Sequence, residues 1–187
     1  MKTPIIITLH GGCFVGGSET WDKPQTKCLE SMGWDVRQLG FPVDEFNETM
    51  EYIVNYIKKL DKKVYILGRS SGGYLAKVIH DTYPELIIHA LYLAPVFDPK
   101  LRASINVKFS NKQKHYFRST PIYPKTDTYD HKTETLILAK NDENVPKACF
   151  TEEQSTFAKC IGCKSHDSVC NTTSSKFKNI VRSFLTK

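Results

Sequence analysis

No apolar run in this sequence is long enough to cross a membrane. The apolar stretch nearest the N-terminus, residues 5–9, is far shorter than the roughly 20 residues of a membrane-spanning helix. It is also shorter than the apolar centre of a secretory signal peptide. We therefore expect a protein without a membrane span, located in the cytoplasm.

Arginine is scarce: the chain has 5 arginines against 21 lysines, with a formal net charge of +6. It has no arginine-rich helix, no basic strand interleaved with aromatic residues and no zinc-finger pattern, so we expect no nucleic-acid partner. Internal repeats and low-complexity tracts are also absent. At 187 residues, we expect residues 1–187 to form one domain with a sizeable core.

The six cysteines follow no metal-binding pattern that we recognise. Cys160 and Cys163 form a C-x-x-C, but the spacing to Cys149 and Cys170 fits no zinc finger. Cysteine is also a common small buried residue in cytoplasmic proteins. We expect neither a metal nor a cofactor, and the spacing leaves the redox state of these thiols open.

The stretch around which the chain is organised is residues 67–73, which contains G-x-S-x-G centred on Ser70. A short apolar, β-branched run precedes it, and residues with helical spacing follow it. A nucleophile on so tight a strand-to-helix turn needs Gly68 and Gly72, because a side chain at either position would strike the strand or the helix. We predict that Ser70 is a nucleophile; a glycine-rich connector is the alternative.

Short apolar runs alternate with segments of helical periodicity along the whole chain. We expect strands at 5–9, 34–39, 63–67, 85–93, 135–139 and 161–164, and helices at about 22–32, 44–60, 74–83, 151–159 and 173–184. This alternation predicts a three-layer α/β/α sandwich around a mainly parallel sheet of about six strands. Polar clusters that follow the strands would then meet at one rim of the sheet.

Residues 99–126 show little periodicity, and we expect an irregular basic insertion or a partial lid there. The segment has no acidic residue but seven basic ones: Lys100, Arg102, Lys108, Lys112, Lys114, Arg118 and Lys125. Over a site, its field would favour an anionic substrate or an acidic partner surface. A solvated lysine-rich lid is the alternative.

A serine hydroxyl needs a base to take its proton and a carboxylate to orient that base. His166 follows a late strand and comes after a suitable acid, whereas the other candidates lie in a helix, in a strand or before that acid: His80, His89, His115 and His131. Asp142 stands three residues beyond the end of the strand at 135–139. We predict His166 as the base and Asp142 as the acid. Asp98 and Glu143 are rival acids, and a turn-forming role for Asp142 is the alternative.

The oxyanion of a tetrahedral intermediate needs amide donors already in place. The residue after the nucleophile, Ser71, would supply one of them. A glycine-rich loop follows the first expected strand, and Gly12 and Cys13 within it would supply others. We therefore predict an oxyanion hole of Gly12, Cys13 and Ser71.

The run from His10 to Ser18 resembles the H-G-G-G-F-x-x-G-S oxyanion motif of the hormone-sensitive-lipase-like branch of the α/β-hydrolases, which contains carboxylesterases and deacetylases. Together with the Ser70, Asp142 and His166 segments, this resemblance covers nearly the whole chain. It implies a minimal α/β-hydrolase fold and a Ser-His-Asp serine hydrolase of carboxylic esters. Cys13 departs from the motif, since the family has glycine there. The chain also begins at the family's third strand, so the resemblance implies a shortened form without the first two strands and the N-terminal cap helices.

Three other functions remain open. An amidase, a thioesterase or a peptidase would use the same triad on a small acyl substrate. The first loop also approaches a phosphate-binding P-loop, but Gly17 stands where that loop has its lysine, so nucleotide binding is a weaker hypothesis. The third is a catalytically silent binding module with a hydrolase fold. The natural substrate and the oligomeric state do not follow from the sequence.

Overall fold

The computed structural model describes residues 3–11, 23–40, 46–104, 111, 115, 118, 120–123, 128–145 and 149–185. Its strands form one six-stranded sheet in the order β2-β1-β3-β4-β5-β6, and each neighbouring pair is parallel. The strands are β1 (Ile5–Leu9), β2 (Asp35–Gln38), β3 (Val64–Arg69), β4 (Ile87–Leu93), β5 (Glu134–Leu138) and β6 (Lys159–Cys160).

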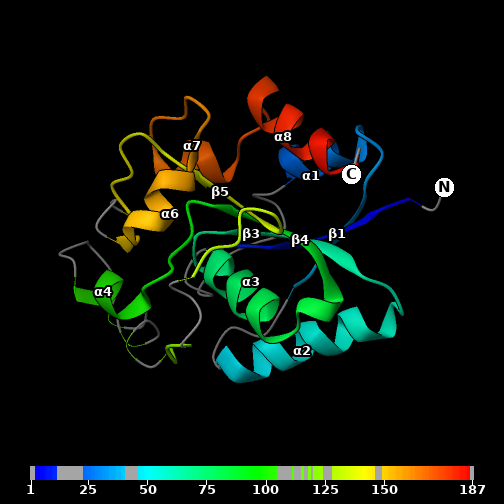
Figure 1. Ribbon diagram of the computed structural model, residues 1–187, viewed down its shortest axis with the longest axis horizontal. Coiled ribbons are helices and arrows are strands. Elements are labelled where there is room, and N and C mark those ends of the chain that lie inside the picture. The colour runs from blue at the N-terminus through cyan, green and yellow to red at the C-terminus, as the bar shows by residue number, and fades with distance from the viewer. Residues whose placement is uncertain are drawn as a thin grey trace.

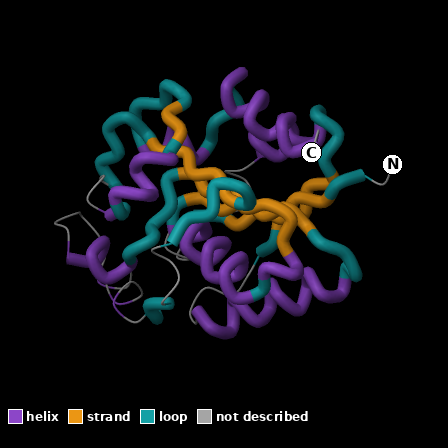
Figure 2. The backbone as a smooth tube through the Cα atoms, viewed as in Figure 1, coloured by secondary structure: helices purple, strands orange, loops and turns teal. Residues whose placement is uncertain are grey.

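Helices cover both faces of the sheet (Figures 1 and 2). One face carries α2 (Phe46–Lys59) and α3 (Ser71–Thr82), and the other carries α1 (Lys23–Glu30), α7 (His166–Cys170) and α8 (Ser175–Leu185). The remaining helices are α4 (Pro99–Ser104), α6 (Glu152–Phe157) and a 3₁₀ turn, η1 (Pro84–Leu86). The predicted three-layer α/β/α sandwich with a parallel sheet is confirmed.

The hydrophobic core consists of two clusters, one on each face of the sheet. β1 contributes to both, because successive side chains of a strand point to opposite faces: Ile5 and Ile7 join one cluster and Ile6 the other. All five residues of β1 are buried. A strand covered on both faces gains about 1.5–3 kcal/mol for each large apolar side chain that it buries, so a continuous apolar run is stable there.

The register of the strands brings their carboxyl ends to one rim. Leu9 of β1 lies opposite Gly68 of β3, and Arg69 of β3 lies opposite Leu93 of β4. On the other side, Leu93 pairs with Ile137 and Leu138 with Cys160. The segments that follow β1, β3, β5 and β6 therefore begin at the same rim, and these segments carry the predicted site residues.

Several boundaries differ from the sequence-based prediction. β4 begins at Ile87 rather than at 85, because residues 84–86 form η1. The last strand is β6 at Lys159–Cys160 rather than 161–164, and α6 ends at Phe157 to make room for it. The chain turns at Gly162, whose φ is 87°, so residues 163–164 leave the sheet but still receive backbone hydrogen bonds from Lys140 and Asn141. Two short helices, α4 and α7, were not predicted, because five or six residues are too few to show periodicity. α4 begins within the segment 99–126 that we expected to be irregular.

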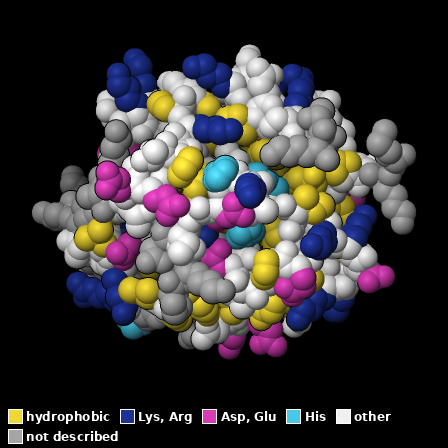
Figure 3. Space-filling model, in the orientation of Figure 1, with side chains coloured by type: hydrophobic (Ala, Val, Ile, Leu, Met, Phe, Trp, Pro, Cys, Tyr) yellow, Lys and Arg dark blue, Asp and Glu magenta, His cyan; other side chains and the backbone are white. Residues whose placement is uncertain are grey.

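None of the helices in the described ranges is long and apolar enough to span a bilayer. On the face shown in Figure 3, acidic and basic side chains are interspersed over the coloured surface.

Candidate active site

Ser70 occupies the sharp corner between β3 and α3, with a φ of 51° and a ψ of −119°. This conformation costs a residue other than glycine about 1–3 kcal/mol, so the surrounding structure must impose it. The Ser70 amide donates to the Leu93 carbonyl at 2.9 Å, and the Ser70 carbonyl accepts from Gly73 at 2.9 Å and Val96 at 3.0 Å. The Ser70 hydroxyl makes no capping hydrogen bond to α3. The corner therefore holds the backbone and leaves the hydroxyl out of the helix cap.

The two glycines of G-x-S-x-G are required by close backbone contact. A Cβ on Gly68 would lie 2.3 Å from the carbonyl oxygen of Gly72. A Cβ on Gly72 would lie 2.3 Å from the carbonyl oxygen of His10 and 2.6 Å from that of Leu9. A side chain at either position would collide with backbone atoms. The two glycines of G-x-S-x-G are therefore required by the close packing of α3 against β1 and β3.

Asp142 and His166 form a buried pair at the same rim. The Nδ1 of His166 lies 2.9 Å from Oδ2 and 3.1 Å from Oδ1 of Asp142. The side chains are 9% and 5% exposed. A carboxylate accepts only, so the Nδ1 carries the proton and the Nε2 is left as the nitrogen that can take another. Asp142 is also a turn former, because its Oδ1 accepts from the amides of Asn144 and Val145 at 2.9 and 2.7 Å.

Burial lowers the pKa of His166, but hydrogen bonds to Asp142 and Cys170, together with electrostatic attraction to these two side chains, outweigh it. The balance raises the pKa of His166 from 6.5 to about 10. The cation is thus favoured in the folded protein. The raised pKa means that charged His166 stabilises the folded protein. This stabilisation is fully present below the pKa of histidine in the unfolded chain, and it is lost as the pH rises through the pKa of His166 in the folded protein.

The raised pKa predicts an alkaline pH profile. Only the neutral imidazole accepts a proton, so with His166 as the base predicted from the sequence, kcat/KM for an ester such as p-nitrophenyl acetate should rise with pH along a limb centred well above 6.5. Cys170→Ala removes one contact that raises the pKa and should move this limb to lower pH. The profile is measured after subtraction of spontaneous hydrolysis. A limb at or below pH 6.5 in the unmodified protein would contradict this account of His166.

The Cys170 thiol contacts both the His166 ring and a backbone group of the Ser70 corner. The Cys170 Sγ lies 3.7 Å from the His166 Nε2 and 3.7 Å from the Leu93 carbonyl oxygen, which is the acceptor of the Ser70 amide. Among the described residues, no hydrogen bond joins the Ser70 hydroxyl to His166. Catalytic hydrogen bonds are often long without substrate and tighten in the complex.

The rival candidates have other contacts or are exposed. The His80 ring contacts Asp81 and Thr133, and the His89 Nε2 lies 2.9 Å from the Thr135 hydroxyl. His131 stacks on Phe157, and His115 is exposed. The Asp98 carboxylate accepts from the amide of Leu101 at 2.8 Å and so holds the first turn of α4, while Glu143 is exposed.

The structure describes part of the predicted oxyanion hole. Ser71 is the first residue of α3, so its amide belongs to the helix turn where the dipole is positive. Gly11 lies against Ser70, because a Cβ at Gly11 would be 3.0 Å from the Ser70 Cβ. Gly12 and Cys13 lie outside the described residues, as does most of the loop with P-loop-like spacing.

A second polar cluster lies within α3, β4 and β5, away from this rim. In the described part of the chain, His80, Asp81 and Glu134 form the group whose spacing could suit a metal ion. The Lys77 ammonium already lies 2.8 Å from Asp81 and 2.9 Å from Glu134. The Tyr92 hydroxyl donates to Glu134 at 2.7 Å. Since lysine supplies the cation, this cluster is a buried ion network. The cysteines of the described residues are free thiols.

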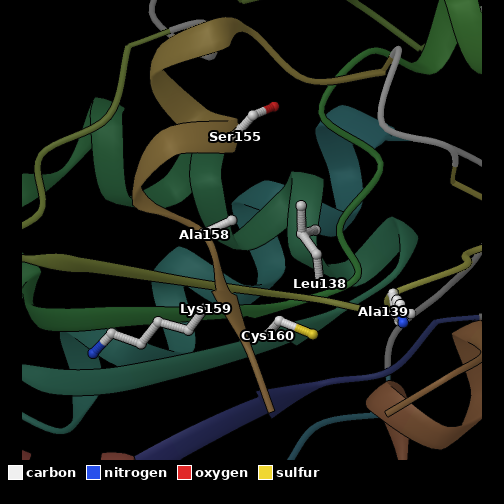
Figure 4. Close-up of a pocket in the computed structure, with 7 residues that line it drawn as sticks. Leu138, Ala139, Ser155, Ala158, Lys159 and Cys160 are labelled. Atoms are coloured by element: carbon white, nitrogen blue, oxygen red, sulfur yellow. The ribbon is translucent and has the colours of Figure 1, made fainter. Parts of the chain in front are cut away.

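A cavity of about 160 Å³ lies between α6 and the β5–β6 edge (Figure 4). Leu138 and Ala139 line it from the end of β5, Ser155 from α6 and Cys160 from β6, while the Lys159 side chain extends away from the others. Neither Ser70 nor His166 lines it. This cavity therefore adjoins the segment that follows β5 and is not lined by Ser70 or His166.

Two contacts of the site were missed in the sequence. Cys170 follows His166 by four residues, a spacing that places both on one face of a helix, but α7 itself was not predicted. Gln25 contacts both Arg69 and the end of α7. No pattern of neighbouring residues in the sequence predicts this contact.

No protein-family model matches the sequence, and no curated protein matches it. Among solved structures, Est1E from Butyrivibrio proteoclasticus is similar to this chain with a TM-score of 0.73 at 19% identity, over 100% of this chain and 90% of its own. MGS-MChE2, an α/β-hydrolase enzyme from the metagenome of sediments from the lagoon of Mar Chica, Morocco, gives 0.72 at 16% identity, over 99% and 91%. CarC, a serine hydrolase involved in carbazole degradation, gives 0.65 at 16%, over 99% and 91%. Identities this low establish the fold alone: the chain has the α/β-hydrolase fold.

Proposed function

We propose that this protein is a serine hydrolase that cleaves carboxylic esters through an acyl-enzyme. The observation that carries the proposal is the buried His166–Asp142 hydrogen bond, at the rim where Ser70 stands on its strained corner. A neutral histidine whose Nδ1 donates to a carboxylate has its Nε2 as the nitrogen that accepts a proton from a neighbouring hydroxyl.

In this mechanism, the Ser70 Oγ attacks the acyl carbon while the His166 Nε2 takes its proton. The same proton then passes to the leaving alcohol, and water repeats the sequence to release the acid. Asp142 orients the ring and stabilises its charged form. The Ser71 amide, with those of Gly12 and Cys13, would hold the oxyanion at the start of α3.

The fold neighbours are consistent with this chemistry, because MGS-MChE2 is named as an α/β-hydrolase enzyme and CarC as a serine hydrolase. The H-G-G-x-F segment supports the hormone-sensitive-lipase-like branch, and carboxylic esters are the substrates that this branch suggests. Amides, thioesters and peptides use the same groups and differ only in the leaving group. We take a small acyl ester as the first substrate to test.

A fluorophosphonate probe tests the proposal directly, since it reacts with activated serines. The unmodified protein should become covalently labelled at Ser70, and Ser70→Ala should not be labelled. Mass spectrometry of the labelled peptide locates the adduct. The neighbouring Ser71→Ala is the matched control and should retain labelling, because only its backbone amide is proposed to act.

Labelling of the unmodified protein and Ser70→Ala to equal extents would remove Ser70 as the nucleophile. Absence of labelling in the correctly folded protein would favour the binding module instead.

A further inference from the structure

A buried polar bridge connects the Ser70 corner to the helix that carries His166. The Arg69 Nε donates to the Gln25 Oε1 at 2.7 Å. The Gln25 Nε2 donates to the carbonyl of Thr172 at 2.9 Å and to that of Cys170 at 3.4 Å. Arg69 is the residue before Ser70, and Cys170 is the last residue of α7. Gln25, on α1, therefore joins the end of β3 to the end of α7.

The chemistry of the bridge allows one arrangement of the amide. Arginine only donates and backbone carbonyls only accept, so the Gln25 oxygen must face Arg69 and its nitrogen must face α7. Gln25 is 1% exposed and Arg69 2%. Water does not reach these groups in place of the protein partners, so each one depends on the others.

α7 is short enough for this bridge to determine its position. It has five residues, with His166 first and Cys170 last. A capping box of Ser165 and Ser168 holds its N-terminal end. Gln25 holds the carbonyl end, and the Cys170 thiol contacts the Leu93 carbonyl beside the Ser70 amide. A displacement of the carbonyl end therefore moves the imidazole relative to the nucleophile.

We propose that Gln25 is a positioning residue, which ties α7 to the Ser70 corner through Arg69 and thereby aims the His166 Nε2 at the Ser70 hydroxyl. The inference builds on the proposed serine hydrolase mechanism. Gln25 acts through α7 and Arg69 rather than on the substrate, so its loss should lower turnover and leave substrate binding largely intact.

Gln25→Glu is the sharpest variant, because it keeps the size of the side chain and an acceptor for Arg69 but has no amide donors for the carbonyls of Cys170 and Thr172. Misplacement of a catalytic group by about 1 Å costs on the order of 10²-fold in rate. We expect kcat for p-nitrophenyl acetate to fall by about 10- to 100-fold, with KM changed by less than about twofold. The rate of fluorophosphonate labelling should fall in parallel. Gln25→Leu, which breaks both ends of the bridge, should behave alike.

Gln154→Leu is the matched control. Gln154 is also 1% exposed, lies on another helix, α6, and accepts from the Thr151 amide at 3.0 Å. Gln154→Leu shows the effect of losing a buried glutamine that does not contact α7. We expect kcat of this variant to stay within about twofold of the unmodified value.

A second readout does not depend on turnover. The proton between the His166 Nδ1 and Asp142 should give a low-field NMR resonance, which should shift or broaden in both Gln25 variants and stay unchanged in Gln154→Leu. An unchanged resonance and kcat in Gln25→Glu, or equal effects of the Gln25 and Gln154 variants, would overturn the inference. If the unmodified protein resists the probe, the serine mechanism fails, while the resonance still decides whether Gln25 positions α7.

Discussion

His166→Ala should lower kcat for p-nitrophenyl acetate by about 10³-fold or more, because losing the base from a Ser-His-Asp triad leaves only oxyanion stabilisation and substrate binding. The side chain is 9% exposed and its replacement leaves Asp142 buried beside a void, so some stability is lost as well. Steady-state kinetics at several pH values, with the midpoint of urea unfolding for each protein, separate the two effects.

His131→Ala provides the matched control. His131 is exposed, precedes β5 and stacks on Phe157, so its removal should leave kcat unchanged. Full activity in His166→Ala would show that another group is the base and that the hydrogen bond to Asp142 serves the fold.

Gly72→Ala should disrupt the corner that holds Ser70. The new Cβ would lie 2.3 Å from the His10 carbonyl oxygen and 2.6 Å from that of Leu9, so β1 or the first turn of α3 must move. Overpacking costs typically about 1–3 kcal/mol and more where backbone must shift. We expect a lower urea midpoint together with loss of fluorophosphonate labelling, since the first loop and the Ser71 amide move with the strand and the helix.

Gly33→Ala separates this clash from simple backbone strain. Gly33 has a φ of 91° with no atom within 4 Å of the added Cβ, and it lies at the end of α1 away from the rim. Its replacement should cost about 1 kcal/mol and preserve labelling. Normal labelling and stability in Gly72→Ala would mean that α3 and β1 are less closely packed than the structure requires.

The order of strands and helices was readable in the sequence because each element carries its own periodicity. β1 is a continuous apolar run since both faces are covered, and α2 repeats buried side chains at helical spacing, as at Phe46, Ile53 and Ile57. The elements too short to show a period were missed or displaced. These are α4, α7 and β6, whose positions depend on the Asp98 cap, the Ser165 capping box and pairing with β5.

The candidate site, like the fold, was predictable only where the signal is local in the sequence. The sequence by itself determined the strand-to-helix corner at Ser70, since a glycine two residues to either side records a packing constraint that is local in the chain. It also ordered Ser70, Asp142 and His166 along the chain, and parallel strands carry such segments to one rim.

Only the tertiary structure decided which groups touch. It joined His166 to Asp142 across 24 positions, put the Cys170 thiol beside the His166 Nε2, and linked Gln25 to Thr172 across 147 positions. Periodicity reports the face on which a side chain lies, and no local pattern reports its partner in another element. For that physical reason the corner at Ser70 could be predicted from seven residues, whereas the contacts of Gln25 with Arg69 and the end of α7 required the folded chain.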